Sequence, residues 1–154
     1  MSTFPALNYH VVFGAKFRMS SIVTPFQEEL YSYIGGIIRG EKGVLLEIGG
    51  MPDHIHILAA FHPAISVSDM LKKIKGNSSK WANEEHELKL KFEWQKGYGA
   101  FTVSSSNVPA VGRYIRNQEE HHRRRSFRDE YIELLNRHGI SFEEKYLFED
   151  EHFG

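Results

Sequence analysis

Residues 44–61 read VLLEIGGMPDHIHILAAF, and this stretch decides how the chain folds. Its centre, Gly49-Gly50-Met51-Pro52-Asp53, has the Gly and Pro content of a turn, and aliphatic runs flank it on both sides. We therefore predict a β-hairpin whose second strand covers 54–61. Because side chains alternate between the two faces of a strand, His54 and His56 share one face, while the isoleucines between and beyond them point toward helices.

Further elements follow on both sides of the hairpin. Strands are predicted at 7–13, 44–48 and 98–103, the last extending back toward Phe92. Thr24, Pro25 and Gln27 have the spacing of a capping box that starts a helix, and Ser66 or Ser68 starts another. After the last strand, one helix follows Asn107 and a final one runs from Ser126 to Gly139.

The order strand, helix, strand, strand, helix, strand, then two helices predicts an α+β fold. It is the ferredoxin-like arrangement of an antiparallel sheet with packed helices, in a single domain over 1–154. This fold hosts many functions, so it does not by itself indicate one.

Composition excludes several classes of protein. The chain has no Cys, which excludes disulfides and thiolate metal sites. No apolar run is long enough for a membrane span, and the first residues lack the pattern of a signal peptide, so we expect a cytoplasmic protein. The net charge is −1, yet arginines crowd 113–128 and lysines crowd 72–80, which is compatible with local binding of phosphate groups.

The predicted helix over 113–118 brings a possible nucleophile next to a possible ligand. Tyr114 and Gln118 are four residues apart and therefore share a helix face. Two imidazoles and an amide oxygen can hold a divalent ion, and imidazole ligands suit Zn or Mn whereas Mg prefers oxygen, so the metal stays open. A tyrosine beside such an ion can attack phosphorus, which suggests phosphodiester transfer. No nucleotide-binding motif is present.

Plainer readings of the same residues stay open at this point. His at alternate strand positions is common in a half-buried strand, and Tyr four residues before Gln is common in helices. We expect His10 to be packed in the interior. His121 and His122 could contact DNA phosphate or cap the end of their helix.

Five stretches in register resemble the single-tyrosine HUH transposases, which are very small transposases of bacterial and archaeal insertion sequences. They are Tyr9–Phe13 followed by Lys16 and Arg18, Met51–Leu58, Lys75–Ser79, Gly97–Ser104 and Tyr114–His122. Together they span nearly the whole chain. Asn77 departs from the pattern, where a further basic residue is expected, and Gln118 favours the insertion-sequence branch over relatives associated with repetitive palindromes.

The resemblance implies a ferredoxin-like HUH fold and a homodimer that nicks single-stranded DNA beside hairpins through a 5′-phosphotyrosine. It implies Tyr114 as the nucleophile and His54, His56 and Gln118 as ligands of Mg²⁺ or Mn²⁺. The DNA contacts we expect are Lys16, Arg18, Lys72, Lys75, Ser78, Ser79 and Lys80. A sheet that binds single-stranded nucleic acid without catalysis is the main alternative, and a rolling-circle replication nuclease is a further one.

Overall fold

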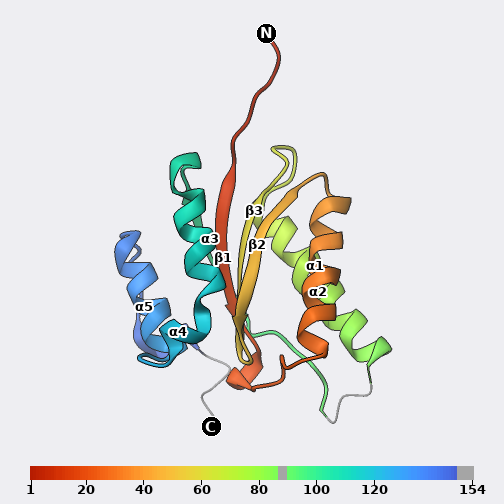
Figure 1. Ribbon diagram of the computed structural model, residues 1–154, viewed down its shortest axis with the longest axis vertical. Helices are drawn as coiled ribbons and strands as arrows, with labels where there is room; N and C mark the ends of the chain where they lie inside the picture. The colour runs from red at the N-terminus through yellow and green to blue at the C-terminus, as the bar shows by residue number, and fades with distance from the viewer. Residues whose placement is uncertain (87–89, 149–154) are drawn as a thin grey trace.

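The computed structural model describes residues 1–86 and 90–148, arranged as a sheet between two layers of helices (Figure 1). The first part follows the predicted order, with β1 (Asn8–Gly14), α1 (Phe26–Gly40), β2 (Val44–Met51), β3 (His54–Ala60), α2 (Val67–Glu85) and β4 (Gly99–Val103). Four helices follow, α3 (Val108–Arg116), α4 (Gln118–His122), α5 (Phe127–Arg137) and the short α6 (Glu144–Leu147). None of the helices described is long and apolar enough to cross a bilayer.

The sheet confirms the predicted α+β, ferredoxin-like arrangement. Its strand order is β2-β3-β1-β4, and every neighbouring pair is antiparallel. Helices α1 and α2 cover one face, while α3, α4 and α5 lie on the other (Figure 1). Strand β3 is therefore internal to the sheet and lies between two helical layers.

The alternation predicted for β3 is confirmed. Ile55, Ile57 and Ala59 belong to the large apolar cluster formed with α1 and α2. His54 and His56 point to the opposite face, where they are fully buried because the helices after β4 cover that face. The histidines thus lie in an interior polar site and not on an open sheet.

Local boundaries differ from the sequence predictions in three places. The β2 strand continues through Gly49 and Gly50 to Met51, so the hairpin turn is shorter than predicted. The capping box is absent, because Pro25 is the N-cap residue of α1 and the Gln27 amide donates to the Tyr31 hydroxyl instead. The last strand does not extend back to Phe92, since Trp94 forms only an isolated bridge with Ala15.

Gly49 is the residue that lets α3 lie close to the sheet. A Cβ atom at this position would lie 2.7 Å from the backbone oxygen of Ile115 and 3.1 Å from its Cγ2 atom. Any side chain at position 49 would therefore displace the helix that carries Tyr114.

Candidate active site

Five polar side chains, four of them buried and His122 partly buried, meet on the face of β3 that α3, α4 and α5 cover, and we call them the polar cluster. They are His54 and His56 from β3, Gln118 and His122 from α4, and Glu130 from α5. The exposed fraction is 0% for His54, His56 and Glu130, and 2% for Gln118. Burying so many polar groups is costly unless they are paired with one another or with an ion.

The Glu130 carboxylate is the centre of the polar cluster. Its Oε1 atom lies 3.3 Å from His54 Nε2, 3.0 Å from His56 Nε2 and 3.1 Å from His122 Nε2. Its Oε2 atom accepts hydrogen bonds from Gln118 Nε2 at 3.0 Å and from the Tyr114 hydroxyl. Among the described residues, His54, His122 and Glu130 form a group whose ligand atoms lie within 4.8 Å of one another, which could hold a metal ion.

Hydrogen bonds outside the polar cluster orient its imidazoles. His54 Nδ1 donates to Asp53 Oδ1 at 2.7 Å, and His122 Nδ1 donates to the Arg125 backbone oxygen at 2.9 Å. His56 Nδ1 lies 2.8 Å from Nε2 of His10, which is buried as predicted. Partners of this kind fix ring orientation in metal sites.

Tyr114 reaches the polar cluster from a helix that ends before Gln118. The predicted single helix over 113–118 is wrong, because α3 ends at Arg116 and α4 begins at Gln118. The Asn117 backbone N–H bonds to the Arg113 and Tyr114 oxygens at this break. Tyr114 and Gln118 nevertheless meet at the same Glu130 oxygen, and the His121 ring stacks on Tyr114 with centroids 4.4 Å apart.

The pKa values of these groups follow from burial and from their close contacts. Burial disfavours ionisation of Glu130, but hydrogen bonds from His122, His54 and His56 outweigh it and hold the carboxyl pKa far below its usual range. Burial and the nearby Glu130 charge raise the pKa of Tyr114 above its usual range. Burial lowers the pKa of His10 to about 3, so this ring is neutral. The polar cluster therefore contains an anionic carboxylate beside a protonated phenol.

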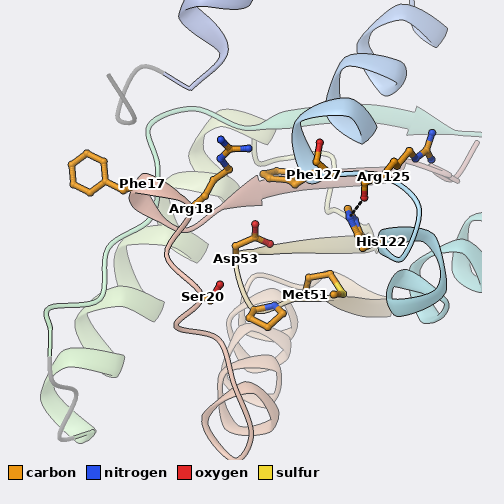
Figure 2. A pocket seen from close by; sticks show the side chains of 10 residues that line it. Phe17, Arg18, Ser20, Met51, Asp53, His122, Arg125 and Phe127 are labelled. Carbon is orange, nitrogen blue, oxygen red and sulfur yellow. Dashed lines mark hydrogen bonds between the residues drawn. The ribbon is translucent and has the colours of Figure 1, made fainter. Parts of the chain in front are cut away.

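A pocket of about 550 Å³ opens beside the polar cluster (Figure 2). Its lining includes Asp53 and His122, and Phe127, whose ring stacks on His54 with centroids 3.9 Å apart. Arg18 and Arg125 also line it, from segments far apart in the sequence. A ligand in this pocket would meet the Arg18 side chain and the residues Asp53 and His122 at the edge of the buried site. The Arg125 guanidinium, by contrast, is paired with Glu133.

The residues predicted to contact DNA lie in several different environments. Arg18 lines the pocket, and Lys16 lies 3.4 Å from a Glu93 oxygen. Lys72 and Lys80 are exposed on α2, across the sheet from Tyr114.

Three other predicted DNA contacts on α2 make hydrogen bonds within the fold. Lys75 Nζ donates to the Gln95 and Gly97 backbone oxygens at 2.7 Å each. Ser78 is buried and accepts from Trp94 Nε1, while the Ser79 hydroxyl donates to the Gly76 oxygen. Through these bonds Lys75, Ser78 and Ser79 help to hold the fold together. Their contact with DNA stays a prediction.

Sequence reasoning placed His54, His56, Gln118 and Tyr114 together but missed Glu130 and left His122 undecided. A signal for Glu130 is present in the sequence. It lies three residues after Phe127 and four before Leu134, within the inward-facing stripe of α5. A carboxylate in such a stripe needs a buried partner. His122 is likewise four residues after Gln118, on the same side of α4.

Comparisons with known proteins point to one family. Residues 3–118 match the family model described as "Transposase IS200 like". The transposase for insertion sequence element IS200 of Salmonella typhimurium is 31% identical over 117 residues, covering 73% of this chain and 76% of that protein. The ISDra2 transposase TnpA of Deinococcus radiodurans is 27% identical over 121 residues, covering 74% and 85%.

Solved structures support the fold. A Deinococcus radiodurans protein described as a transposase superposes with a TM-score of 0.62 at 24% identity, covering 77% of this chain and 95% of that one. A REP-associated tyrosine transposase, solved bound to a REP hairpin, gives a TM-score of 0.59 at 16% identity, covering 79% and 74%. At these identities the likeness concerns the fold alone.

Proposed function

This chain belongs to the IS200-like transposase family, and on that premise we propose that it cleaves and rejoins single-stranded DNA through Tyr114. The observation that carries the proposal is the meeting of the Tyr114 hydroxyl with the polar cluster at Glu130 Oε2. A nucleophile and a set of possible metal ligands then share one buried site. The active domain in this proposal is the whole chain, 1–154.

The residues of the polar cluster fit a divalent cation. We propose His54, His56 and Gln118 as ligands, as the sequence suggests, and Mg²⁺ or Mn²⁺ as the ion. Imidazole and amide oxygen donors are suitable for Mn²⁺, and Asp53 orients His54 as ligand-bound imidazoles require. When bound, the cation would polarise a phosphate oxygen as a Lewis acid.

The chain's own residues would bind and align the DNA. Arg18 lines the pocket beside the polar cluster, so a phosphodiester there would lie near its guanidinium group. Glu130 Oε2 holds the Tyr114 hydroxyl, which fixes the direction of its oxygen. Burial and the nearby Glu130 charge raise the pKa of Tyr114, so the phenol keeps its proton in the DNA-free protein and Glu130 positions it.

The proposed step is a transesterification. A bond forms between the Tyr114 oxygen and phosphorus, and the bond from phosphorus to the 3′ oxygen breaks. The phenol loses one proton and the 3′ oxygen gains one, so the products are a 5′-phosphotyrosine and a free 3′ hydroxyl. Reversal by another 3′ hydroxyl would rejoin the strand without a nucleotide cofactor.

The DNA partner we propose is a single strand that carries a hairpin at the element end. A structural relative was solved bound to a REP hairpin, which makes a hairpin the appropriate first substrate to test. The non-catalytic alternative needs an open sheet for base stacking. Here both sheet faces are covered by helices, which disfavours it (Figure 1).

The test of the proposed function is formation of a covalent protein–DNA adduct. Protein, Mn²⁺ and a hairpin oligonucleotide labelled downstream of the cut are mixed, denatured and separated by size. Tyr114→Phe should abolish the labelled protein band, whereas Tyr131→Phe, which removes a hydroxyl from a buried ring on α5, should keep it. A band that persists in Tyr114→Phe would show that another residue is the nucleophile.

A further inference from the structure

A second pocket, of about 580 Å³, adjoins the pocket beside the polar cluster, and we call it the apolar pocket. Phe17 and Ser20 line both pockets, so the two meet at the turn that follows β1. The larger apolar side chains in its lining are Phe17, Met19, Val23, Leu90 and Phe92. All of them except Phe92 are exposed to solvent. Several apolar side chains left exposed together are typical of a binding site.

Phe17 is held in a backbone conformation that residues with a side chain rarely adopt. The φ angle is 60° at Phe17 and 49° at Arg18, so two consecutive residues lie in the left-handed region and neither is glycine. The Lys16 N–H donates to the Glu93 backbone oxygen at 2.9 Å, which holds the turn in place. The Arg18 N–H donates to the Ala15 oxygen, also at 2.9 Å.

This strained turn directs an aromatic ring outward. The Phe17 side chain is 40% exposed, and Figure 2 shows its ring directed away from the polar cluster. Burial of the ring therefore does not compensate for the strain. Backbone strain of this kind concentrates at binding and catalytic sites, where it holds a group ready for a ligand.

The rim of the apolar pocket has more positive than negative charge. Lys16 Nζ and Lys91 Nζ each lie 3.4 Å from an oxygen of Glu93, so a single carboxylate faces two ammonium groups. Lys16 Nζ also lies 5.4 Å from the centre of the Phe17 ring. A base stacked at Phe17 would thus have a cation beside it for its phosphate. An aromatic surface with cations at its edge is the combination by which proteins bind single-stranded nucleic acid.

We propose that the apolar pocket binds an unpaired nucleobase of the DNA single strand, stacked on Phe17, an assignment that rests on the proposed function. The pockets meet at Phe17 and Ser20, so one strand can occupy both. Its backbone would pass Arg18 in the first pocket and Lys16 at the rim of the second. A base anchored there fixes which phosphate reaches Tyr114. Because stacking uses the face of a base and not its hydrogen-bonding edge, we expect any of the four bases to be accepted.

The first experiment compares DNA affinities without cleavage. Fluorescence anisotropy, with a metal chelator present, measures binding of a labelled hairpin oligonucleotide that has unpaired flanks. Phe17→Leu keeps an apolar side chain but loses the planar face, so it should bind about 5–150-fold more weakly, the cost of one lost stacked base. Phe17→Tyr keeps the ring and should bind like the wild type. The same hairpin without its unpaired flanks should bind equally to Phe17→Leu and the wild type.

Tyr146→Leu is the matched control. Tyr146 is also an exposed aromatic residue with a lysine over its ring, at 4.9 Å from Lys145 Nζ, but it does not line the apolar pocket. Its loss should leave DNA affinity unchanged. Equal affinity of Phe17→Leu and the wild type for the flanked hairpin would overturn the proposal. An equal loss in Tyr146→Leu would also overturn it.

Photochemical cross-linking tests the contact in the wild-type protein and needs no variant to fold. The flanked hairpin carries 5-iodouracil at one unpaired position at a time, and mass spectrometry identifies the linked peptide after irradiation. We expect one position to link to the peptide that contains Phe17. Cross-links confined to other peptides would refute the stacked base.

The outcomes separate this pocket from the proposed chemistry. Binding that depends on Phe17, together with no covalent adduct in the wild type, would count against the proposed function alone. Normal adduct formation with no dependence on Phe17 would count against the stacked base alone. A lower sedimentation mass of Phe17→Leu than of the wild type would assign the apolar pocket to a second copy of the chain and overturn the proposal.

Discussion

Gly49→Ala should move the helix that carries Tyr114 away from the sheet. The added Cβ would lie 2.7 Å from the Ile115 oxygen, whereas ordinary contact begins at 3.4 Å, so the two must separate by 3.4 − 2.7 = 0.7 Å. The opposing atom belongs to helix backbone and cannot rotate away as a side-chain end would. The whole of α3 must shift, and Tyr114 lies next to the contact in sequence.

We expect Gly49→Ala to lower both the stability of the fold and the rate of adduct formation. Overpacking of this size destabilises proteins by about 1–3 kcal/mol. For a chain of this length, each kcal/mol lowers Tm by roughly 2–4 °C, so we expect a fall of about 2–12 °C. A misplacement approaching 1 Å can lower a reaction rate by up to about 100-fold, so adduct formation should fall further than stability.

Thermal melting and the rate of adduct formation measure these two effects. Gly36→Ala is the control, because it is an exposed position in α1 where the nearest atom to a new Cβ is Arg39 Nη2 at 4.0 Å. This substitution should raise stability by about 0.5–1 kcal/mol through helix propensity and leave the rate unchanged. If Gly49→Ala melted like the wild type and formed adduct at the full rate, the close approach of α3 would be functionally irrelevant.

Three further predictions concern the rest of the molecule. Lys75→Met should lower the free energy of unfolding, measured with urea, by about 1.5 kcal/mol, because the Lys75 ammonium bonds to two backbone oxygens. Lys72→Met should change that free energy by no more than about 0.5 kcal/mol, but should lower the slope of DNA affinity against salt concentration by about one unit. Equal effects of the two variants on stability would contradict this distinction. Glu130 has a folded-state pKa below the ordinary 4.5, so its carboxylate stabilises the fold above that value and loses this contribution as the pH falls toward the folded-state pKa. Between neutral pH and about pH 3, the free energy of unfolding should therefore fall less in Glu130→Gln than in the wild type. Equal falls in the two proteins would refute the claim that ionised Glu130 stabilises the fold. Finally, we expect a homodimer joined partly through sheet edges, so sedimentation should give twice the 17.8 kDa chain mass, and an active monomer would count against it.

The sequence predicted those parts of the structure that depend on local pattern. Alternation over 54–61 predicted which face of β3 carries the histidines. Ser126 was predicted to begin the last helix, and its bond to the Asp129 backbone N–H confirms this; of Ser66 and Ser68, which were both candidates, Ser66 is the cap because it accepts from Asp69. The break at Asn117 was not predicted, because nothing in the run from Arg113 to Gln118 opposes a continuous helix.

Glu130 was missed for a different reason. It meets its partners only through the docking of α5 over a strand far earlier in the chain, and sequence spacing carries no information about that docking. Its place in an apolar stripe indicates burial but does not identify the partner. The predicted ligand set of His54, His56 and Gln118 was therefore built from local patterns alone.

The two faces of the sheet are packed to very different extents, and this has a consequence for how the protein loses activity on heating. The face toward α1 and α2 carries the large apolar cluster, whereas α3 and α5 are held by two much smaller clusters. Regions with fewer buried apolar contacts open at lower free energy than the rest of a domain. We expect heat inactivation to precede cooperative melting, and amide protons of α5 to exchange with solvent before those of β1 and β3.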